Sequence, residues 1–499
     1  MASDSGLSRR DFLTRMTAVA VGAPLLGVGQ QQSARAAETP AQEAGRVIEI
    51  SPGPHLFIDD HLIERTIRLT RTTHRPERLS GPVIPKAEPW HEMPLFFHRV
   101  IRDPETGRFR MWYNIRNNSP DVPFTVYAYA ESDDGLHWRR PKLGLVAING
   151  STDNNLFMVV RAFGLGFVDD GPAVADPARR YKMAYYRISD PQGLCVAFSA
   201  DGVRFTDYAQ TPVLTDLGDI VDACYDPLRK GYIACFKAHS TEADGYRGST
   251  PNAPEGYRRL VGESVSEDFI HWRDPWRVVV ADPREPGMWE FYGMAPQVRG
   301  DLYLAFLRVL RDDLPADAGG PVHGIGWTEL ATSRDGENWT RHREPFLDRD
   351  PEAGTWDHAM AWVGDCVTVD DRDYVYYGGY SAGHKVGNRQ IGVAVLRKNG
   401  FVSRDAGVRP GLLRTPMLRV DAAAITVNAE VGGELLVRVA DRSGKPVSGF
   451  DWSDCAPTHG DKLAHPVRWN GKLASLRQEP VRLEFRLREA KLYGFDLTA

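Results

Sequence analysis

The sequence predicts an all-β protein: a five-bladed β-propeller followed by a small C-terminal β-sandwich. Near-copies of the motif Ser-x-Asp-Gly-x-x-Trp begin at Ser132, Ser199, Ser266 and Ser333, each 67 residues after the one before, and a decayed fifth copy lies at 397–401. Fixed self-similarity at this scale indicates a repeat architecture. Within each repeat, short apolar runs alternate with turn residues and show no helical periodicity. Small repeated sheets close radially, so five copies predict five blades.

The motif itself predicts a structural turn. Asp and Gly favour a tight turn, and the Ser hydroxyl can bond the nearby backbone. The Trp or Phe at the end of each copy is expected to fill the gap between neighbouring blades. The motif therefore indicates the fold and gives little direct information on chemistry.

The chain divides into three predicted regions: a targeting signal, the propeller and the sandwich. Their expected bounds are 1–37, 46–402 and 405–499. Residues 46–90 should supply a leading segment, in which Leu56–Asp60 is the strand that completes the last blade. The blades are expected at 91–150, 151–215, 216–285, 286–350 and 351–402. Alternating apolar residues at 424–428, 434–440, 481–487 and 492–495 predict the sandwich.

The N-terminal segment has the pattern of a twin-arginine export signal. Arg9 and Arg10 precede an apolar stretch at 16–28, and Ala34-Arg35-Ala36 offers a cleavage site. The apolar stretch has about 13 residues, whereas a membrane-spanning helix needs roughly 20. We therefore expect a secreted or periplasmic bacterial protein with no membrane anchor after signal cleavage.

The composition argues against several classes of partner and cofactor. The net charge is −5, with 61 Lys and Arg against 66 Asp and Glu, so neither nucleic acid nor an anionic membrane is an expected partner. Five irregularly spaced cysteines predict no disulfide framework. No zinc, nucleotide or dinucleotide motif is found, so no cofactor and no metal centre are expected. A structural cation in the central channel is the open alternative, with His98, His358 and His384 as the side chains that could approach it.

A register argument identifies candidate catalytic carboxylates. Each predicted innermost strand is followed by a turn and an aromatic second strand, and nine or ten residues before these turns lie His98, Asp170, Asp222, Glu290 and Gly364. Three consecutive blades would then place Asp, Asp and Glu at one level around the axis. Converging carboxylates shift one another's pKa values. Such a set suits glycosidic bond cleavage, in which one carboxyl protonates the leaving oxygen and another attacks or activates water.

On these residues the sequence resembles the five-bladed propeller glycoside hydrolases of the arabinanase, xylosidase and fructosidase type, which place Asp, Asp and Glu on three successive blades. The run from Glu290 to Pro296 before Gly300 is similar to the acid-bearing strand of the arabinanase group, and the C-terminal sandwich resembles the fructosidase appendage. The resemblance implies Glu290 as the general acid, Asp170 as base or nucleophile and Asp222 as the group that tunes the acid. The roles of Glu290 and Asp222 could be exchanged. The fructosidase motifs Trp-Met-Asn-Asp-Pro-Asn and Glu-Cys are missing, so no sugar is implied.

Polar and aromatic residues near the predicted strand starts could bind a carbohydrate substrate, because sugars stack on aromatic faces and hydrogen-bond to Asp and His. The candidates are His98, Asp60, Trp289, Tyr292, Trp356, Asp357 and His358. Asp59 and Asp60 are also reserve positions for the catalytic carboxylates, and a capped turn before His61 is their alternative. Core packing is the alternative for the aromatic residues, Asp357 and His358.

The sequence thus leads to the hypothesis of a secreted glycoside hydrolase with an Asp/Asp/Glu set at the propeller mouth. The first alternative is a non-catalytic glycan-binding propeller, which would have aromatic residues at the mouth and carboxylates in turns. A sialidase-like hydrolase is a second alternative, suggested by the repeated motif. A metal oxidoreductase is suggested only by the export signal.

Overall fold

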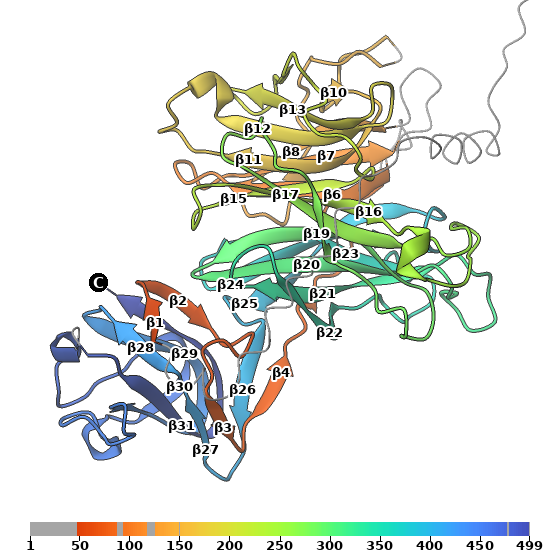
Figure 1. The fold of residues 1–499 in the computed structure, drawn as a ribbon. Coiled ribbons are helices and arrows are strands. Elements are labelled where there is room, and N and C mark those ends of the chain that lie inside the picture. The colour runs from red at the N-terminus through yellow and green to blue at the C-terminus, as the bar shows by residue number, and fades with distance from the viewer. Residues whose placement is uncertain (1–46, 87–92, 117–124, 149, 477–478, 499) are drawn as a thin grey trace, which may run out of the picture. The chain divides into compact units, whose positions relative to one another are not determined.

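The structure, a computed structural model, is built of β-strands and four short 3₁₀ turns in the part that it describes (Figure 1). It describes residues 47–86, 93–116, 125–148, 150–476 and 479–498, so the predicted signal 1–37 lies outside the described residues. Within the described ranges, no helix is long and apolar enough to cross a membrane. The 3₁₀ turns are η1 (Pro177–Arg179), η2 (Glu242–Asp244), η3 (Trp452–Asp454) and η4 (Leu473–Leu476).

Strand pairing from residue 93 to residue 397 divides into five consecutive antiparallel groups. The first contains β6 (Met93–Arg102), β7 (Phe109–Arg116), β8 (Thr125–Ser132), β9 (Trp138–Arg139) and β10 (Leu156–Val159). The second contains β11 (Ala162–Asp169), β12 (Tyr181–Arg187), β13 (Gly193–Ser199) and β14 (Thr206–Asp207). The third contains β15 (Val221–Asp226), β16 (Gly231–His239), β17 (Arg259–Ser266) and β18 (Trp276–Val279).

The fourth and fifth groups share a single parallel bridge between Gly326 and Met360. The fourth contains β19 (Trp289–Arg299), β20 (Leu302–Arg311), β21 (Ile325–Ser333) and β22 (Trp339–Leu347). The fifth contains β23 (Met360–Val369), β24 (Arg372–Tyr380), β25 (Arg389–Arg397) and β5 (Glu77–Arg78).

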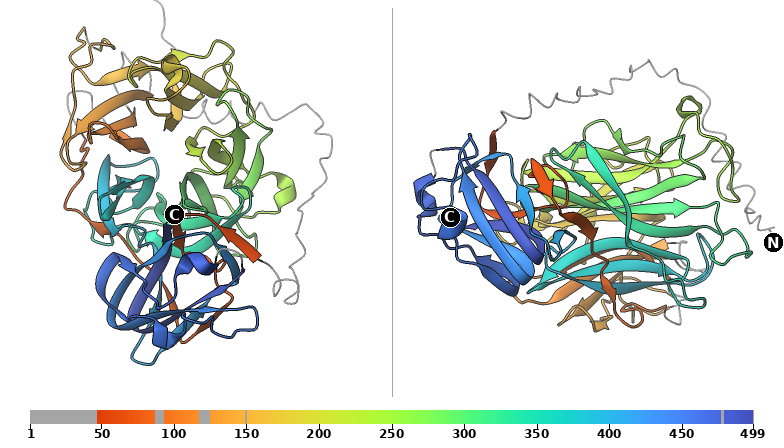
Figure 2. Two further views of the ribbon diagram at one scale, coloured as in Figure 1. Left: turned by 90° about the vertical axis from the view of Figure 1, so that its left-hand side faces the viewer. Right: turned by 90° about the horizontal axis from the view of Figure 1, so that it is seen from below.

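The first strands of the five groups form a closed ring. Strand β6 contacts β11 and β23, β11 contacts β15, and β19 contacts both β15 and β23. Figure 2 (left) shows the groups arranged around this ring. The predicted all-β propeller fold is confirmed.

The strand that completes the fifth group is not the predicted one. Strand β5 pairs with β25, whereas β2 (Gly53–Leu56) pairs with β31 of the C-terminal domain. The prediction for Leu56–Asp60 was wrong because Phe57 is buried in the core of that domain, which holds the segment there.

The C-terminal domain draws strands from both ends of the described chain. Its two longest strands, β29 (Ala424–Ala440) and β31 (Arg482–Thr498), pair with each other over almost their whole length. The other strands are β1 (Val47–Ile50), β2, β3 (Arg65–Ile67), β4 (Thr70–Thr73), β26 (Val402–Ala406), β27 (Gly411–Arg414), β28 (Met417–Val420) and β30 (Thr458–Pro466). The N-terminal contribution was not predicted, because these short strands have no partner within their own sequence region.

The repeated motif forms the turn between the third and fourth strands of the first four groups. In each copy the Ser hydroxyl accepts a hydrogen bond of 2.9 Å from the backbone three residues on. The residue that donates this bond has a positive φ in every copy: 77° at Gly135, 82° at Gly202, 70° at Phe269 and 70° at Gly336. The closing aromatic ring reaches the neighbouring group, as when Trp138 meets Tyr376 edge-on at 6.1 Å. The structural interpretation of the motif is confirmed.

The two ends of the ring differ in their connections. Where the innermost strands end, the links to the second strands are mostly short, such as 227–230, 300–301 and 370–371. Where the innermost strands begin, links between second and third strands include 240–258 and 312–324. We call these the turn end and the loop end. Functional residues are often carried by long loops on a rigid scaffold, so we expect a functional site at the loop end.

A buried glutamate joins the third and fourth groups. The indole of Trp339 donates a 2.7 Å hydrogen bond to one oxygen of Glu263, and the Glu263 side chain is fully buried. Burial raises the pKa of Glu263 to about 8, with the indole hydrogen bond opposing the shift. The carboxyl is therefore protonated in the folded protein at neutral pH.

Replacing Glu263 by Gln should make the protein more stable at alkaline pH. Because the folded pKa lies above the unfolded value, the wild type loses stability as pH rises from about 4.5 through about 8. Because Gln does not titrate, the variant should avoid most of that loss. Its gain in the free energy of unfolding over the wild type should be on the order of 2–5 kcal/mol larger at pH 8.5 than at pH 4.5. Free energies of unfolding in urea at the two pH values measure it. The exposed neighbour Glu267→Gln is the control, and an equal pH slope in both variants would contradict the assignment.

Candidate functional site

Charged side chains converge at the loop end of the third, fourth and fifth groups. Glu290 is the second residue of β19, Arg259 the first of β17, and Asp312 directly follows β20. His384 lies in the loop between β24 and β25. Because neighbouring strands alternate in direction, the starts of β17 and β19 and the end of β20 all meet at this end of the ring.

Arg259 joins two carboxylates. Its Nη1 donates to both oxygens of Glu290, at 2.8 and 2.7 Å, and lies 3.5 Å from Oδ2 of Asp312. The backbone N–H of Arg259 adds a 3.1 Å bond to Glu290. The nearest oxygens of the two carboxylates are thus no more than about 6 Å apart. Both carboxylate side chains are 0% exposed.

Asp312 also orients a histidine. Nδ1 of His384 lies 3.0 Å from Oδ1 of Asp312, and the side-chain amide of Asn252 donates to the same oxygen at 3.2 Å. Nε2 of His384 is buried and has no hydrogen-bond partner among the residues that the structure describes. Burial lowers the pKa of His384 to about 3, so the ring is neutral at neutral pH. When Nδ1 carries the proton toward Asp312, Nε2 is a free acceptor.

The surroundings move the pKa values of the two carboxyls apart. Burial raises the pKa of Glu290, and the charge of Asp312 adds to that rise, against the opposing charge of Arg259. Burial also acts upward on Asp312, but the hydrogen bond from His384 and the charge of Arg259 outweigh it and lower the pKa. Glu290 is therefore the group that holds a proton more readily, and Asp312 is the carboxylate.

An aromatic surface lies beside this pair. Tyr292 stacks on Trp362, with ring centroids 4.8 Å apart and an interplanar angle of 19°, and the ring of His384 meets Tyr292 edge-on at 4.9 Å. The ammonium of Lys237, which pairs with Asp219, lies 5.0 Å from the centre of the Tyr292 ring. Tyr292 is partly exposed. The predicted position of Tyr292 at the mouth thus coincides with the charged cluster.

A pocket of about 320 Å³ lies near the start of β19. It is lined by Tyr246, Arg247, Gly248, Arg258, Ala281, Asp282, Pro283, Glu285, Gly287, Met288 and Trp289. Trp289 and Arg258 precede Glu290 and Arg259 in the chain, but successive side chains of a strand point to opposite faces, and neither Glu290 nor Arg259 lines this pocket. Two aromatic rings and several polar groups are what a sugar unit requires.

Asp222 lies deeper in the ring than Glu290 and has a structural partner. Arg308, on β20, donates to both of its oxygens, at 2.6 and 2.8 Å, and both side chains are buried. The guanidinium reaches the axis past Gly293, where an added Cβ would lie 3.2 Å from Arg308. Gly293 also has φ of +129°, which disfavours other residues. Burial raises the pKa of Asp222, and the charge of Arg308 opposes the shift.

Asp170 does not reach the level of the other carboxylates. It follows the last residue of β11 at the turn end, where it accepts a 2.8 Å hydrogen bond from Tyr232 and pairs with Lys182. The prediction that Asp170, Asp222 and Glu290 lie at one level of the ring was wrong. The link 170–180 is long because it contains η1, so the ninth residue before its end lies in the link and not inside strand β11. His98 lies in the middle of β6 beside Gly364, and burial lowers its pKa to about 3.

The remaining predicted residues lie away from the carboxylate pair. Asp59 binds Arg334 at 2.8 Å and Asp60 binds Arg404 at 2.8 Å, next to the C-terminal domain. These contacts place both aspartates outside the loop-end cluster.

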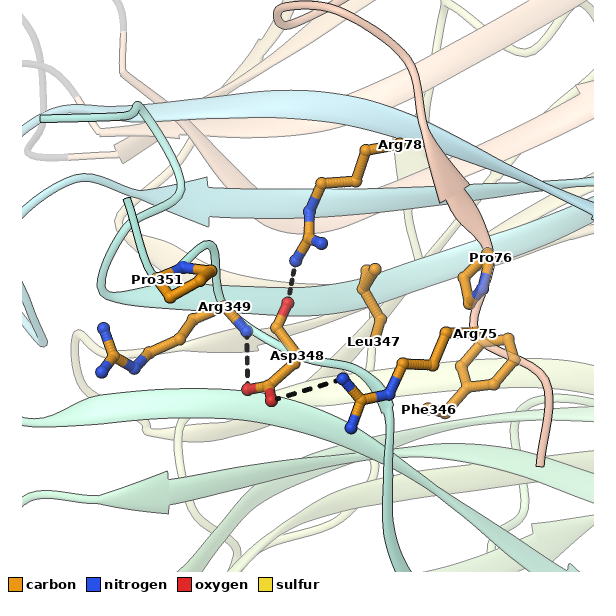
Figure 3. Close-up of a pocket in the computed structure, with 8 residues that line it drawn as sticks. All are labelled: Arg75, Pro76, Arg78, Phe346, Leu347, Asp348, Arg349 and Pro351. Atoms are coloured by element: carbon orange, nitrogen blue, oxygen red, sulfur yellow. Dashed lines mark hydrogen bonds and ion pairs between the residues drawn. The ribbon is translucent and has the colours of Figure 1, made fainter. Parts of the chain in front are cut away.

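Trp356, Asp357 and His358 support the joint between the fourth and fifth groups. Trp356 stacks on Tyr377 at 5.3 Å, Asp357 accepts from Arg78 at 3.0 Å, and Nε2 of His358 lies 2.9 Å from Asp317. A pocket of about 230 Å³ lies here (Figure 3), and its lining residues are Arg75, Pro76, Arg78, Phe346, Leu347, Asp348, Arg349 and Pro351. Arg75 and Arg78 have acidic partners, and Arg349 donates to the backbone carbonyl of His358.

Sequence reasoning did not identify Asp312 or Arg259 and considered His384 only near a central ion. The available signal was the polar run Arg311-Asp312-Asp313 at the end of an apolar strand. In the described part of the chain, no group of three or more His, Cys, Asp and Glu side chains is arranged to hold a metal ion.

Asp222→Asn should destabilise the fold, because it leaves the buried Arg308 without a counter-charge. We expect a loss of about 3–5 kcal/mol in the free energy of unfolding, measured in urea. The double variant Asp222→Asn with Arg308→Met removes both charges and should recover most of the loss. A stable single variant that has lost only activity would contradict the structural role.

No family model and no curated protein matches the chain. Several solved structures are similar to it. The β-1,2-mannobiose phosphorylase from Listeria innocua is 12% identical, covering 65% of this chain and 97% of the other, with a TM-score of 0.43. The Bombyx mori GH32 β-fructofuranosidase is 10% identical, covering 84% and 94%, with a TM-score of 0.41. An N-acetylgalactosamine deacetylase from F. plautii is 15% identical, covering 66% and 96%, with a TM-score of 0.40.

Proposed function

We propose that this chain is a glycan-processing enzyme, a glycoside hydrolase that uses Glu290 and Asp312 at the loop end of the ring. The observation that carries the proposal is the close pairing of two carboxyls whose pKa values are shifted in opposite directions. Paired carboxyls with separated pKa values are the acid and base of glycosidic bond cleavage. The second catalytic carboxylate in this proposal is Asp312, whereas the sequence had predicted Asp170 and Asp222 as the partners of Glu290.

In the proposed mechanism, Glu290 protonates the oxygen of the leaving sugar. Asp312 acts at the anomeric carbon, either as the nucleophile or as the base that activates a water. His384 holds Asp312 in its ionised form and fixes its orientation. The configuration of the first-formed sugar product distinguishes attack by Asp312 from attack by water.

The sugar unit at the cleaved bond would lie against Tyr292, the partly exposed ring that meets His384 edge-on beside the pair. Glu290 is fully buried behind Arg259, so a bound glycan must draw the guanidinium away before the acid can reach the leaving oxygen. Arg259 then interacts with the substrate instead of with Glu290. The twin-arginine pattern at Arg9 and Arg10 supports secretion or a periplasmic location for this activity.

The second candidate is a non-catalytic glycan-binding propeller. It is favoured by one observation: both carboxylates are completely buried, and each has protein partners. The surface around Tyr292 would then bind a sugar without cleaving it. Cleavage of a glycan would distinguish the hydrolase from the binding propeller, whereas glycan binding is expected of both.

Glu290→Gln and Asp312→Asn should each lower the turnover number on aryl glycosides or polysaccharides by about 10³-fold. The loss in Glu290→Gln should shrink on dinitrophenyl glycosides, because such a leaving group needs little protonation. Asp170→Asn, at the turn end, is the matched control and should stay within about threefold of the wild type. Rates over a panel of substrates measure this.

Two results would contradict the assignment. Undiminished turnover in Glu290→Gln would exclude that residue as the acid. A wild type that binds glycans but cleaves none of them would favour the binding propeller.

A further inference from the structure

The cations around Tyr292 fall into two classes. Three of them have carboxylate partners: Lys237 pairs with Asp219, Arg259 with Glu290 and Asp312, and Arg308 with Asp222. Two do not. Arg389 and Lys385 make no ion pair and no side-chain hydrogen bond with any residue that the structure describes. The inner part of the loop end therefore carries two positive charges without a counter-charge.

Arg389 is the more constrained of the two. It is the first residue of β25, paired in register with Tyr380, and it is only 8% exposed. Its guanidinium lies 4.6 Å from the centre of the Tyr380 ring, and its charge acts on the hydroxyl of Tyr292. A buried guanidinium is costly unless an anion meets it. A cation–π contact offsets only about 1–2 kcal/mol of that cost.

Lys385 stands next to the catalytic pair. It lies in the loop 381–388, directly after His384, and adopts φ of 70°. This left-handed conformation is uncommon for a lysine and is retained only where the surroundings enforce it. Burial lowers the pKa of its amine to about 8, and the charge of Arg259 adds to the shift while that of Asp312 opposes it. The residue as a whole is exposed to solvent. Lys385 and Arg389 stand at the two ends of one short loop, and the charges of Arg259 and Asp312 act both on Lys385 and on Tyr292, the ring that Arg389 influences.

We propose that Arg389 and Lys385 bind the anionic group, a carboxylate or a sulfate ester, of an acidic glycan. The inference rests on the proposed function and specifies its substrate class. A planar guanidinium binds a carboxylate or sulfate through two parallel hydrogen bonds, and a lysine adds a mobile charge. The acidic sugar would lie over Tyr292, with its neighbouring glycosidic bond toward Glu290 and Asp312. Neutral glycans would leave both cations without a partner.

Binding is measured by calorimetry with the whole protein. The probes are oligosaccharides from pectate, alginate, glucuronoxylan and carrageenan, each beside its carboxyl-reduced or desulfated form, and inorganic sulfate as the free anion. The variants are Arg389→Gln, Arg389→Lys and Lys385→Gln. The control is Lys230→Gln, because Lys230 is also an exposed lysine with positive φ, 57°, but lies in the turn 227–230 at the turn end.

We expect at least one acidic oligosaccharide to bind at least about tenfold more tightly than its neutral form, a difference of about 1.4 kcal/mol. Arg389→Gln and Lys385→Gln should each abolish most of that preference, Arg389→Lys should retain part of it, and Lys230→Gln should leave it unchanged.

Three results would overturn the inference. They are equal affinity for every acidic and neutral pair, an undiminished preference in Lys385→Gln, and sulfate binding as tight as that of any glycan. The readout also separates this inference from the proposed function. Acid-dependent binding without cleavage would refute only the hydrolase, whereas cleavage of neutral glycans that is insensitive to Arg389→Gln would refute only the acidic substrate.

Discussion

The ion pair between Arg308 and Asp222 fills the centre of the ring, and the placement of the other groups depends on it. The guanidinium comes from the second strand of the fourth group, reaches the axis past Gly293, and meets a carboxylate from the third group. Phe96 lies 4.7 Å from the same guanidinium. Removing either charge would leave the other buried without a counter-charge. With the axis occupied in this way, the proposed site of Glu290 and Asp312 lies at the strand ends.

Much of the fold could be predicted because its signal is local. The 67-residue repeat specifies one turn in each of the first four groups, and that turn is built from hydrogen bonds within six residues. The errors came from long-range choices. The segment around Phe57 alternates like a closing strand, but its apolar face packs in the C-terminal domain. Counting residues back to Asp170 failed because η1 lengthens one link in a way that the repeat does not show.

The candidate site was predicted in part for the same reason. Glu290 and Tyr292 follow from the position of a single strand, and both lie at the loop end. Their partners could not be predicted, since Arg259, Asp312 and His384 come from three different groups and only the closed ring brings them together. Asp222 was placed near the axis correctly, but nothing local in the sequence indicates that Arg308 would neutralise it.

The division between a turn end and a loop end has a consequence for how such a protein can change. The repeated turns maintain the geometry of the sheets, while Asn252, Asp312 and His384 sit on three separate excursions of the chain. Each excursion can be lengthened, shortened or exchanged without breaking a strand pair. A loop can therefore be exchanged on an unaltered frame of strands, but a new ligand preference requires matched changes in the loops that meet at Asp312.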